Sequence, residues 1–335
     1  EIWVKDKAGV MGAAAEVSFL SYYESAAFNA KYVTDKTLGA AIEDGQTAFR
    51  LWSPTASAVT VNVYAQQDAA APSESRALTK DENGVFETTV ASNLNGQYYD
   101  FAVTNFGQTT ANVPDPYALS SNANGRRSMV VDWDQVAEPT GFDQPFVPQY
   151  ANHAGIAIME MQTRDFTSSA HWDGPAADRG KYRGLHDTGT ALPNGTKTGF
   201  DYVKELKAAG LTHVQLQPAY DFQSVDETRL DDPAYQALPV NGIYNWGYDP
   251  QQYNAPEGSF SSDPADGTTR VDEFRDFVND YNQAGIGVVM DVVYNHMPSQ
   301  TGSSFDKVFP GYYFRAKSYS GAGVDIASQR AMVHK

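Results

Sequence analysis

The sequence has no cysteine among its 335 residues, and this absence excludes disulfide bonds and thiolate metal sites. The composition therefore gives no sign of the redox compartment. No apolar run approaches the ~20 residues that a membrane-spanning helix needs. The start of the chain, Glu1 to Lys7, lacks the basic and apolar regions of a signal peptide. We expect a soluble chain from which any targeting segment has been removed.

Basic residues are scarce as well. The chain has 41 acidic and 24 basic residues and a formal charge of −17. Such a surface repels a phosphate backbone and offers nothing to an anionic membrane, so we expect neither nucleic acid binding nor membrane insertion. Aromatic residues reach 13%, with 20 tyrosines, whose rings combine an apolar face with a polar tip. A neutral carbohydrate would suit that surface.

Several common catalytic motifs are missing. The sequence has no Gly-rich phosphate loop ending in Lys-Ser/Thr, no dinucleotide fingerprint after a strand and no nucleophile elbow. Nucleotide-dependent and serine-hydrolase chemistry are therefore not expected. The histidines never approach the spacing of a zinc site, so a structural zinc is not expected either; they are His153, His171, His186, His213, His296 and His334.

The chain is longer than one hydrophobic core usually allows, and its patterns divide it. Residues 1–34 have no clear period and are interpreted as a linker or the tail of an upstream module. Residues 35–136 contain short alternating runs separated by turn residues, which is typical of an immunoglobulin-like β-sandwich. Residues 137–154, interrupted by proline and glycine, are interpreted as a second linker.

From residue 155 onward, strand-like and helix-like patterns alternate. Apolar runs at 156–161, 212–216 and 286–293 predict strands, and the segments 200–210 and 271–282 have helical spacing. This order predicts a parallel sheet, either doubly wound or an eight-stranded barrel, and the long loops after each strand favour the barrel. Residues 155–335 would then be the N-terminal part of a (β/α)8 TIM barrel. The third strand would leave an apolar open edge that another polypeptide must cover.

The strongest local signal is the segment 291–296, which places a carboxylate in an apolar strand and an amide and an imidazole at its end. In a barrel, the carboxyl end of a strand faces the active site. A buried Asp291 must accept hydrogen bonds from cations or amides, or take up a proton. Asp291, Asn295 and His296 are thus candidate site residues. The alternative is a structural carboxylate with a loop amide and a surface histidine.

The second signal is the loop 244–250, which has three aromatic residues within five positions and a glycine that lets the backbone fold closely. A sugar needs flat aromatic platforms flanked by short polar groups, and Tyr248 beside Asp249 provides both. Trp246 is the third candidate in this loop. The alternative is that these rings only pack the loop against the barrel. The aromatic residues of the sandwich alternate into its core, so none of them is named as a ligand contact.

An ordered series of motifs resembles glycoside hydrolase family 13, specifically its type I pullulanases. Two segments resemble a family 48 carbohydrate-binding module, and five more follow in the family's order; the segments are 49–56 and 114–118, then 184–190, 212–218, 244–250, 256–260 and 291–296. The string Tyr-Asn-Trp-Gly-Tyr-Asp-Pro at 244–250 separates pullulanases from isoamylases and branching enzymes. Departures are small: Phe260 replaces a usual tyrosine, and Met297-Pro298 follows the histidine.

The resemblance implies a role for individual residues. Tyr248 would stack under the sugar at the cleavage site, and His296 would hydrogen-bond the primary hydroxyl of that sugar. Asp291 would pair with an arginine beside the nucleophile. Asn295 matches a position that ligates calcium in related amylases, so calcium is a possible ion, while no cofactor is required. A carboxylate pair formed by Asp291 with Glu160 or Asp165 is not expected.

The resemblance also implies what this chain would not contain. The nucleophilic, acid/base and stabilising carboxylates would lie beyond Lys335, so the chain alone is expected to be inactive. The complete protein would be a secreted or cell-surface, starch-debranching hydrolase that cleaves α-1,6 bonds by a retaining mechanism. Its partners would be pullulan, amylopectin, glycogen or limit dextrins and the C-terminal remainder of the enzyme. The alternatives are a non-catalytic α-glucan-binding fragment and a bifunctional amylopullulanase.

Overall fold

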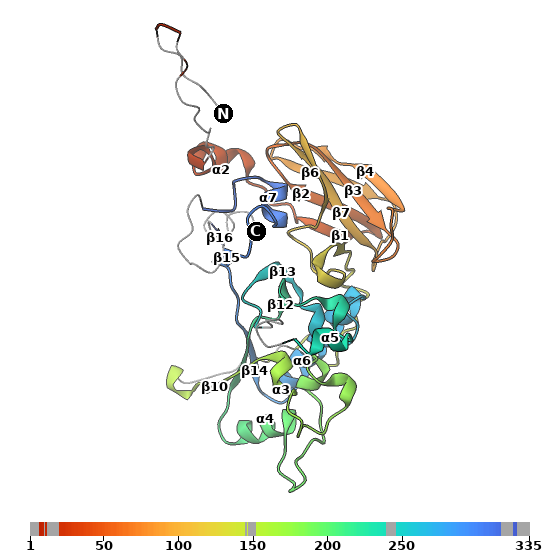
Figure 1. Ribbon diagram of the computed structural model, residues 1–335, viewed down its shortest axis with the longest axis vertical. Helices are drawn as coiled ribbons and strands as arrows, with labels where there is room; N and C mark the ends of the chain where they lie inside the picture. Colours follow the sequence, from red (N-terminus) through yellow and green to blue (C-terminus); the bar gives the residue numbers. More distant parts are fainter. Residues whose placement is uncertain are drawn as a thin grey trace.

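The computed structural model describes residues 7–9, 11, 20–144, 146, 152–238, 246–315 and 324–326. In Figure 1, antiparallel strands form the upper part of the molecule, a small parallel sheet with helices lies below, and β12 and β13 lie between the two. None of the helices within the described ranges is long and apolar enough to cross a membrane.

The upper part consists of two antiparallel sheets. One has the strand order β1 (Gly39–Glu43), β2 (Gln46–Trp52), β6 (Val85–Val90), β5 (Thr79–Lys80). The other has the order β4 (Glu74–Ala77), β3 (Ala56–Tyr64), β7 (Tyr98–Asn105), β8 (Gln108–Val113), with β9 (Ser128–Met129) paired to β7. Alternating residues point into one shared core, where Phe49 of β2 meets Tyr99 of β7 with ring centroids 5.0 Å apart. The prediction of a mostly β-sheet first part is confirmed.

The core of these two sheets also includes residues from both ends of the sequence. Helices α1 (Leu20–Tyr23) and α2 (Ala26–Tyr32), which lie within the predicted first linker, contribute Tyr23 and Phe28. Phe309 and Tyr312, which follow α7 (Ser304–Val308), pack on Trp52 with ring centroids 5.2 and 5.1 Å away. The Ser53 hydroxyl also donates to the Val308 carbonyl at 2.6 Å. The sheets therefore share one core with a distant segment of the chain.

The lower part contains three parallel strands in the order β10 (Ile158–Met161), β11 (His213–Leu216), β14 (Gly287–Met290). Its helices are α3 (Thr163–Phe166), α4 (Gly199–Ala208), α5 (Pro233–Gln236) and α6 (Gly267–Gln283). The three strands and the helices α4 and α6 overlap the segments predicted for them. Helix α6 begins earlier than expected because the Asp266 side chain accepts from the Thr268 amide and caps it.

The third predicted strand differs from its prediction. It ends at Met290 rather than Val293, and Val289 and Met290 are 37% and 40% exposed instead of buried on both faces. The physical reason is that, among the described strands, β14 pairs with β11 alone. On the opposite side of the sheet, Ile158 of β10 is 52% exposed. Both outer strands thus present apolar side chains to solvent in the described part of the chain.

Two further strand pairs lie outside the strands that the sequence predicts. β12 (Tyr220–Phe222) pairs antiparallel with β13 (Pro250–Pro256), and β15 (His296–Met297) pairs antiparallel with β16 (Val324–Asp325). β13 connects the two halves of the molecule, because Gln251 and Gln252 donate to the carbonyls of Asn124 and Gly125 at 2.7 and 3.1 Å. In each pair, a short segment that follows a parallel strand is paired with a segment later in the chain. The local sequence pattern does not predict such long-range pairing.

The shared core generates a prediction for Phe309→Ala. Removing a fully buried aromatic side chain that contacts Trp52 and Tyr312 should lower the free energy of unfolding by about 3–5 kcal/mol. Urea unfolding followed by tryptophan fluorescence measures this change. Tyr202→Ala, on the exposed face of α4, is the control and should cost less than about 1 kcal/mol. Equal, small losses in both variants would show that this segment does not stabilise the sheets.

Candidate functional site

Two of the predicted site residues form a direct contact at the carboxyl end of the parallel strands. The Tyr248 hydroxyl donates to Asp291 Oδ2 at 2.7 Å. Asp291 follows β14, and its amide donates to the Leu216 carbonyl at 2.9 Å, so the backbone of Asp291 continues the parallel pairing with β11. Asp291 is half-buried outside the strand rather than buried within it. The hydrogen-bond partner that we expected for the Asp291 carboxylate is therefore the phenol of Tyr248.

The loop that carries Tyr248 lies directly against the end of β11. Gly247 has a φ of 76°, and a Cβ atom there would lie 2.5 Å from the Pro218 carbonyl oxygen. A residue other than glycine would force this loop away from the strand end. Trp246 is 50% exposed, while Tyr244 and Asn245 of the same predicted motif lie outside the described residues.

Asp249 has contacts that differ from those of Asp291. Its Oδ1 accepts from the Ser224 hydroxyl at 3.0 Å, and its carbonyl accepts from the Gln223 amide at 3.0 Å. Burial raises the pKa of the Asp249 carboxyl, and the hydrogen bond from Ser224 opposes that rise. In the described structure Asp249 therefore anchors the start of β13 against the segment after β12.

His296 holds the backbone of Tyr248. Its Nε2 lies 2.9 Å from the Tyr248 carbonyl oxygen, and its Nδ1 lies 3.0 Å from the Asn295 Nδ2. A carbonyl only accepts and an amide NH2 only donates, so Nε2 carries the proton and Nδ1 is the acceptor. The tautomer is therefore determined by two neighbours from the same chain.

The alternative that His296 is a surface histidine is wrong. The side chain is 5% exposed, because β15 pairs with β16 and the Tyr253 hydroxyl donates to the His296 carbonyl at 2.9 Å. The ring of Tyr253 also contacts those of Tyr220 and Tyr294, with centroids 5.7 and 5.5 Å away. Replacing His296 would thus remove two side-chain hydrogen bonds as well as any contact with a ligand.

Asn295 is exposed and uses its side chain to orient His296. Its carbonyl accepts from the Ile326 amide at 2.9 Å. Within the described ranges, the group of acidic side chains that could share one ion lies elsewhere, at Asp221, Glu227 and Glu257. A calcium ion at Asn295 stays a prediction.

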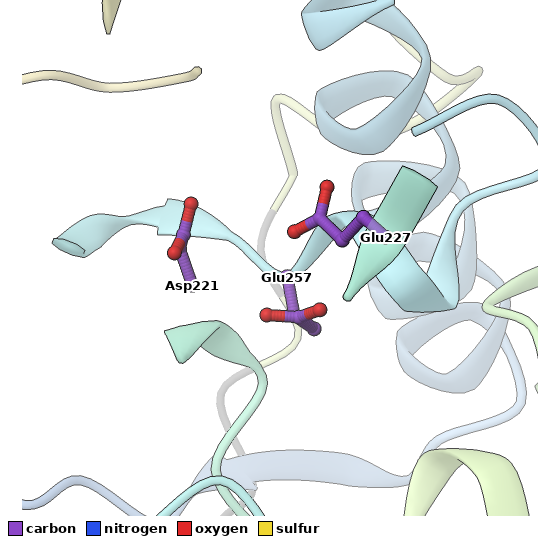
Figure 2. Close-up of side chains that lie close together, drawn as sticks. All are labelled: Asp221, Glu227 and Glu257. Atoms are coloured by element: carbon purple, nitrogen blue, oxygen red, sulfur yellow. The ribbon is translucent and has the colours of Figure 1, made fainter. Parts of the chain in front are cut away.

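The buried acidic group was not identified from the sequence. Figure 2 shows the carboxylates of Asp221, Glu227 and Glu257 close together, and their oxygens lie within 4.8 Å of one another. Arg270 of α6, fully buried, donates to Glu227 at 2.9 Å and lies 3.6 Å from Asp221. Burial, followed by the charge of Glu227, raises the pKa of the Asp221 carboxyl to about 7. The sequence signal available was a carboxylate flanked by Pro256 and Gly258 and another flanked by two aromatic residues.

The chain is similar in sequence to a known family and to known proteins. Residues 37–118 match the family described as Carbohydrate-binding module 48 (Isoamylase N-terminal domain). The chain is 35% identical over 317 residues to a pullulanase of Bacillus subtilis (strain 168), covering 93% of this chain and 41% of that protein. The chain therefore spans less than half the length of this curated relative.

Solved structures of pullulanases are also similar to this chain. A mutant of the pullulanase from Paenibacillus barengoltzii, complexed with maltotriose, has a TM-score of 0.83 and 36% identity over 93% of this chain and 47% of that chain. The pullulanase from Anoxybacillus sp. LM18-11, complexed with maltotetraose, has a TM-score of 0.79 and 36% identity, covering 93% of this chain and 43% of that chain.

The Asp221 carboxyl generates a pH prediction. Its pKa is raised above the ordinary 3.8, so its contribution to stability is complete below about pH 4 and is lost as the pH rises to about 7. Relative to Asp221→Asn, which does not titrate, the wild type should lose roughly 2–4 kcal/mol of unfolding free energy across this range. Urea titrations at a series of pH values measure the difference. A difference between Asp221→Asn and the wild type that stays constant over this pH range would contradict the assignment.

Proposed function

We propose, from the premise that this chain resembles the N-terminal part of pullulanases over 93% of its length, that the whole protein is a starch-debranching glycoside hydrolase. Its substrates would be pullulan and branched α-glucans, cleaved at α-1,6 bonds with retention. The observation that carries the proposal is the convergence of Tyr248, Asp291 and His296 at the carboxyl end of the parallel strands. This is the position at which parallel β/α folds place their active sites.

In this proposal the three parallel strands are the first of a (β/α)8 barrel, and the two antiparallel sheets are an immunoglobulin-like carbohydrate-binding module. The C-terminal remainder of the protein would add the strands that cover Ile158 and Met290. It would also supply the nucleophile, the acid/base and the stabilising carboxylate. The chain spans 41% of its Bacillus subtilis relative, which supports such a division.

The chain's own residues would build the platform for the sugar ring. Tyr248 presents an aromatic face, and its hydroxyl is held by Asp291 at 2.7 Å, which restricts rotation of the ring. A carboxylate accepts up to about four hydrogen bonds, so Asp291 can bind Tyr248 and the expected arginine at the same time. His296, with both ring nitrogens occupied, would act chiefly by holding the Tyr248 backbone at a fixed height. Its direct contact with a sugar hydroxyl would require one of these bonds to open.

In the retaining mechanism, a carboxylate attacks the anomeric carbon while a carboxylic acid donates a proton to the leaving oxygen. Both must be held close to the productive position, because a misplacement of about 1 Å can lower the rate by about 100-fold. The platform would supply this alignment. A secreted or cell-surface location is part of this proposal, because a polymer supplied from outside the cell is too large to cross a membrane before it is cleaved.

Glucan binding without turnover is a second candidate function. A cleft of about 780 Å³ lies between the antiparallel sheets and the segments after β12 and β15. Polar side chains line much of it, among them Asp100, Asn112, Gln251 and Lys307. Affinity for pullulan without release of maltotriose would favour this candidate. Equal release of reducing ends from amylose and pullulan would instead favour an amylopullulanase.

The platform is tested by Tyr248→Ala in the full-length protein. Turnover of pullulan should fall at least about 100-fold, because the anomeric carbon is no longer aligned. Tyr248→Phe keeps the ring, loses the bond to Asp291 and should lose about tenfold. Tyr202→Ala, at an exposed position on α4, is the control and should retain activity. Unchanged pullulan turnover in Tyr248→Ala would remove the basis of the proposed function.

A further inference from the structure

The buried acidic group carries an unusual excess of negative charge. Asp221, Glu227 and Glu257 are all fully buried, and within the described ranges Arg270 is the cation among them. Three ionised carboxylates and one guanidinium would leave an excess of two negative charges. Isolated buried charges are strongly unfavourable, so this arrangement must be compensated within the fold.

Hydrogen bonds compensate the three carboxylates unequally. Both oxygens of Glu257 accept from backbone amides, those of Phe222 at 3.0 Å and Ser259 at 2.9 Å. Asp221 Oδ2 accepts from the Ser121 hydroxyl at 2.9 Å, while Asp221 Oδ1 and Glu227 Oε1 are buried without a hydrogen-bond partner. Orphaned buried oxygens of this kind are rare and indicate strong attraction for a cation or a proton.

An unpartnered buried amide oxygen lies on the strand that pairs with Asp221. Gln252 is directly opposite Asp221 in the β12–β13 pairing, and its buried Oε1 has no hydrogen-bond partner. Directly opposite residues place their side chains on the same face of a sheet. Carboxylate and amide oxygens close together are the ligands that calcium prefers, at 2.3–2.6 Å from the ion. The oxygens of the three carboxylates lie within 4.8 Å of one another. Two oxygens that bind the same calcium ion at these distances can be this far apart.

The guanidinium of Arg270 occupies this space instead. A Cβ atom on Gly258 would lie 2.2 Å from both Arg270 Nη2 and Glu227 Oε2, so the backbone is packed tightly against this ion pair. The carbonyls of Pro256 and Pro264 accept from Arg270 at 3.2 and 2.9 Å and hold the guanidinium from two further sides. The cation is thus attached to helix α6 by a covalent side chain.

We propose that Arg270 is a tethered cation that fills a latent divalent-cation site and thereby joins the antiparallel sheets to the parallel strands without a metal. Ser121 connects the antiparallel part of the molecule to these charged residues, because its hydroxyl accepts from Arg270 at 3.2 Å and donates to Asp221. The strand β13 connects the same charged residues to the candidate site, since it begins two residues after Tyr248. The inference stands on the buried contacts and does not depend on the proposed function.

The test is thermal unfolding of the full-length protein in EDTA and in millimolar calcium chloride. The wild type should have the same Tm in both. Arg270→Ala should lower Tm in EDTA by roughly 10 °C, because it leaves buried carboxylates unpaired, and calcium should restore at least half of that loss. Adding Glu257→Gln to Arg270→Ala should abolish the calcium rescue. No rescue by calcium, or a rescue that survives Glu257→Gln, would overturn the proposal.

A second variant covers the case in which Arg270→Ala does not fold. Asp221→Asn leaves Arg270 in place and removes one excess charge, so at about pH 8 its Tm should equal or exceed that of the wild type. It should also be insensitive to calcium. A fall in Tm of more than about 5 °C at this pH would show that the cluster carries no excess charge and would also overturn the proposal.

Discussion

The fold depends on one fully buried guanidinium at the point where its two halves meet. Arg270 extends from α6 toward side chains of β12 and of the segment after it, and toward Ser121 from the antiparallel part. Because a buried charge is tolerated only with partners on several sides, these segments must all be in place at once. Gly258 and the carbonyls of Pro256 and Pro264 complete the enclosure. The aromatic contact of Phe309 and Tyr312 with Trp52 forms a second, apolar joint.

The candidate site follows from these joints. The strand β13 extends from the buried charged residues around Arg270 to Asp249. The hydroxyl of Tyr253, on the same strand, donates a hydrogen bond to the backbone carbonyl of His296. His296 in turn bonds the carbonyl of Tyr248, whose hydroxyl meets Asp291. The backbone of β13, followed by these hydrogen bonds, therefore links the junction of the two halves to the proposed sugar platform. In this arrangement the antiparallel sheets before the parallel strands are a structural part of the site's support.

The sequence predicts what depends on local pattern. Alternation at 48–52 and 59–64 predicts β2 and β3, and the apolar runs predict the three parallel strands in their order. It does not predict β12–β13 or β15–β16, because each is a short segment stabilised by a partner far away in the chain. The same limit explains the errors at His296 and β14, where burial depends on which strands lie alongside. Asp221, Glu257 and Arg270 are ordinary loop and helix residues in the sequence, and only the fold brings their charges together.

Amide hydrogen exchange of the full-length protein, measured with and without maltotriose, tests most directly whether this junction supports a sugar platform. The account predicts slower exchange in bound protein over residues 246–253 and 291–297, since ligand contact with Tyr248 would stabilise the hydrogen bonds that hold both segments. Protection confined to the strands of the antiparallel sheets, with no change in these two segments, would contradict the account.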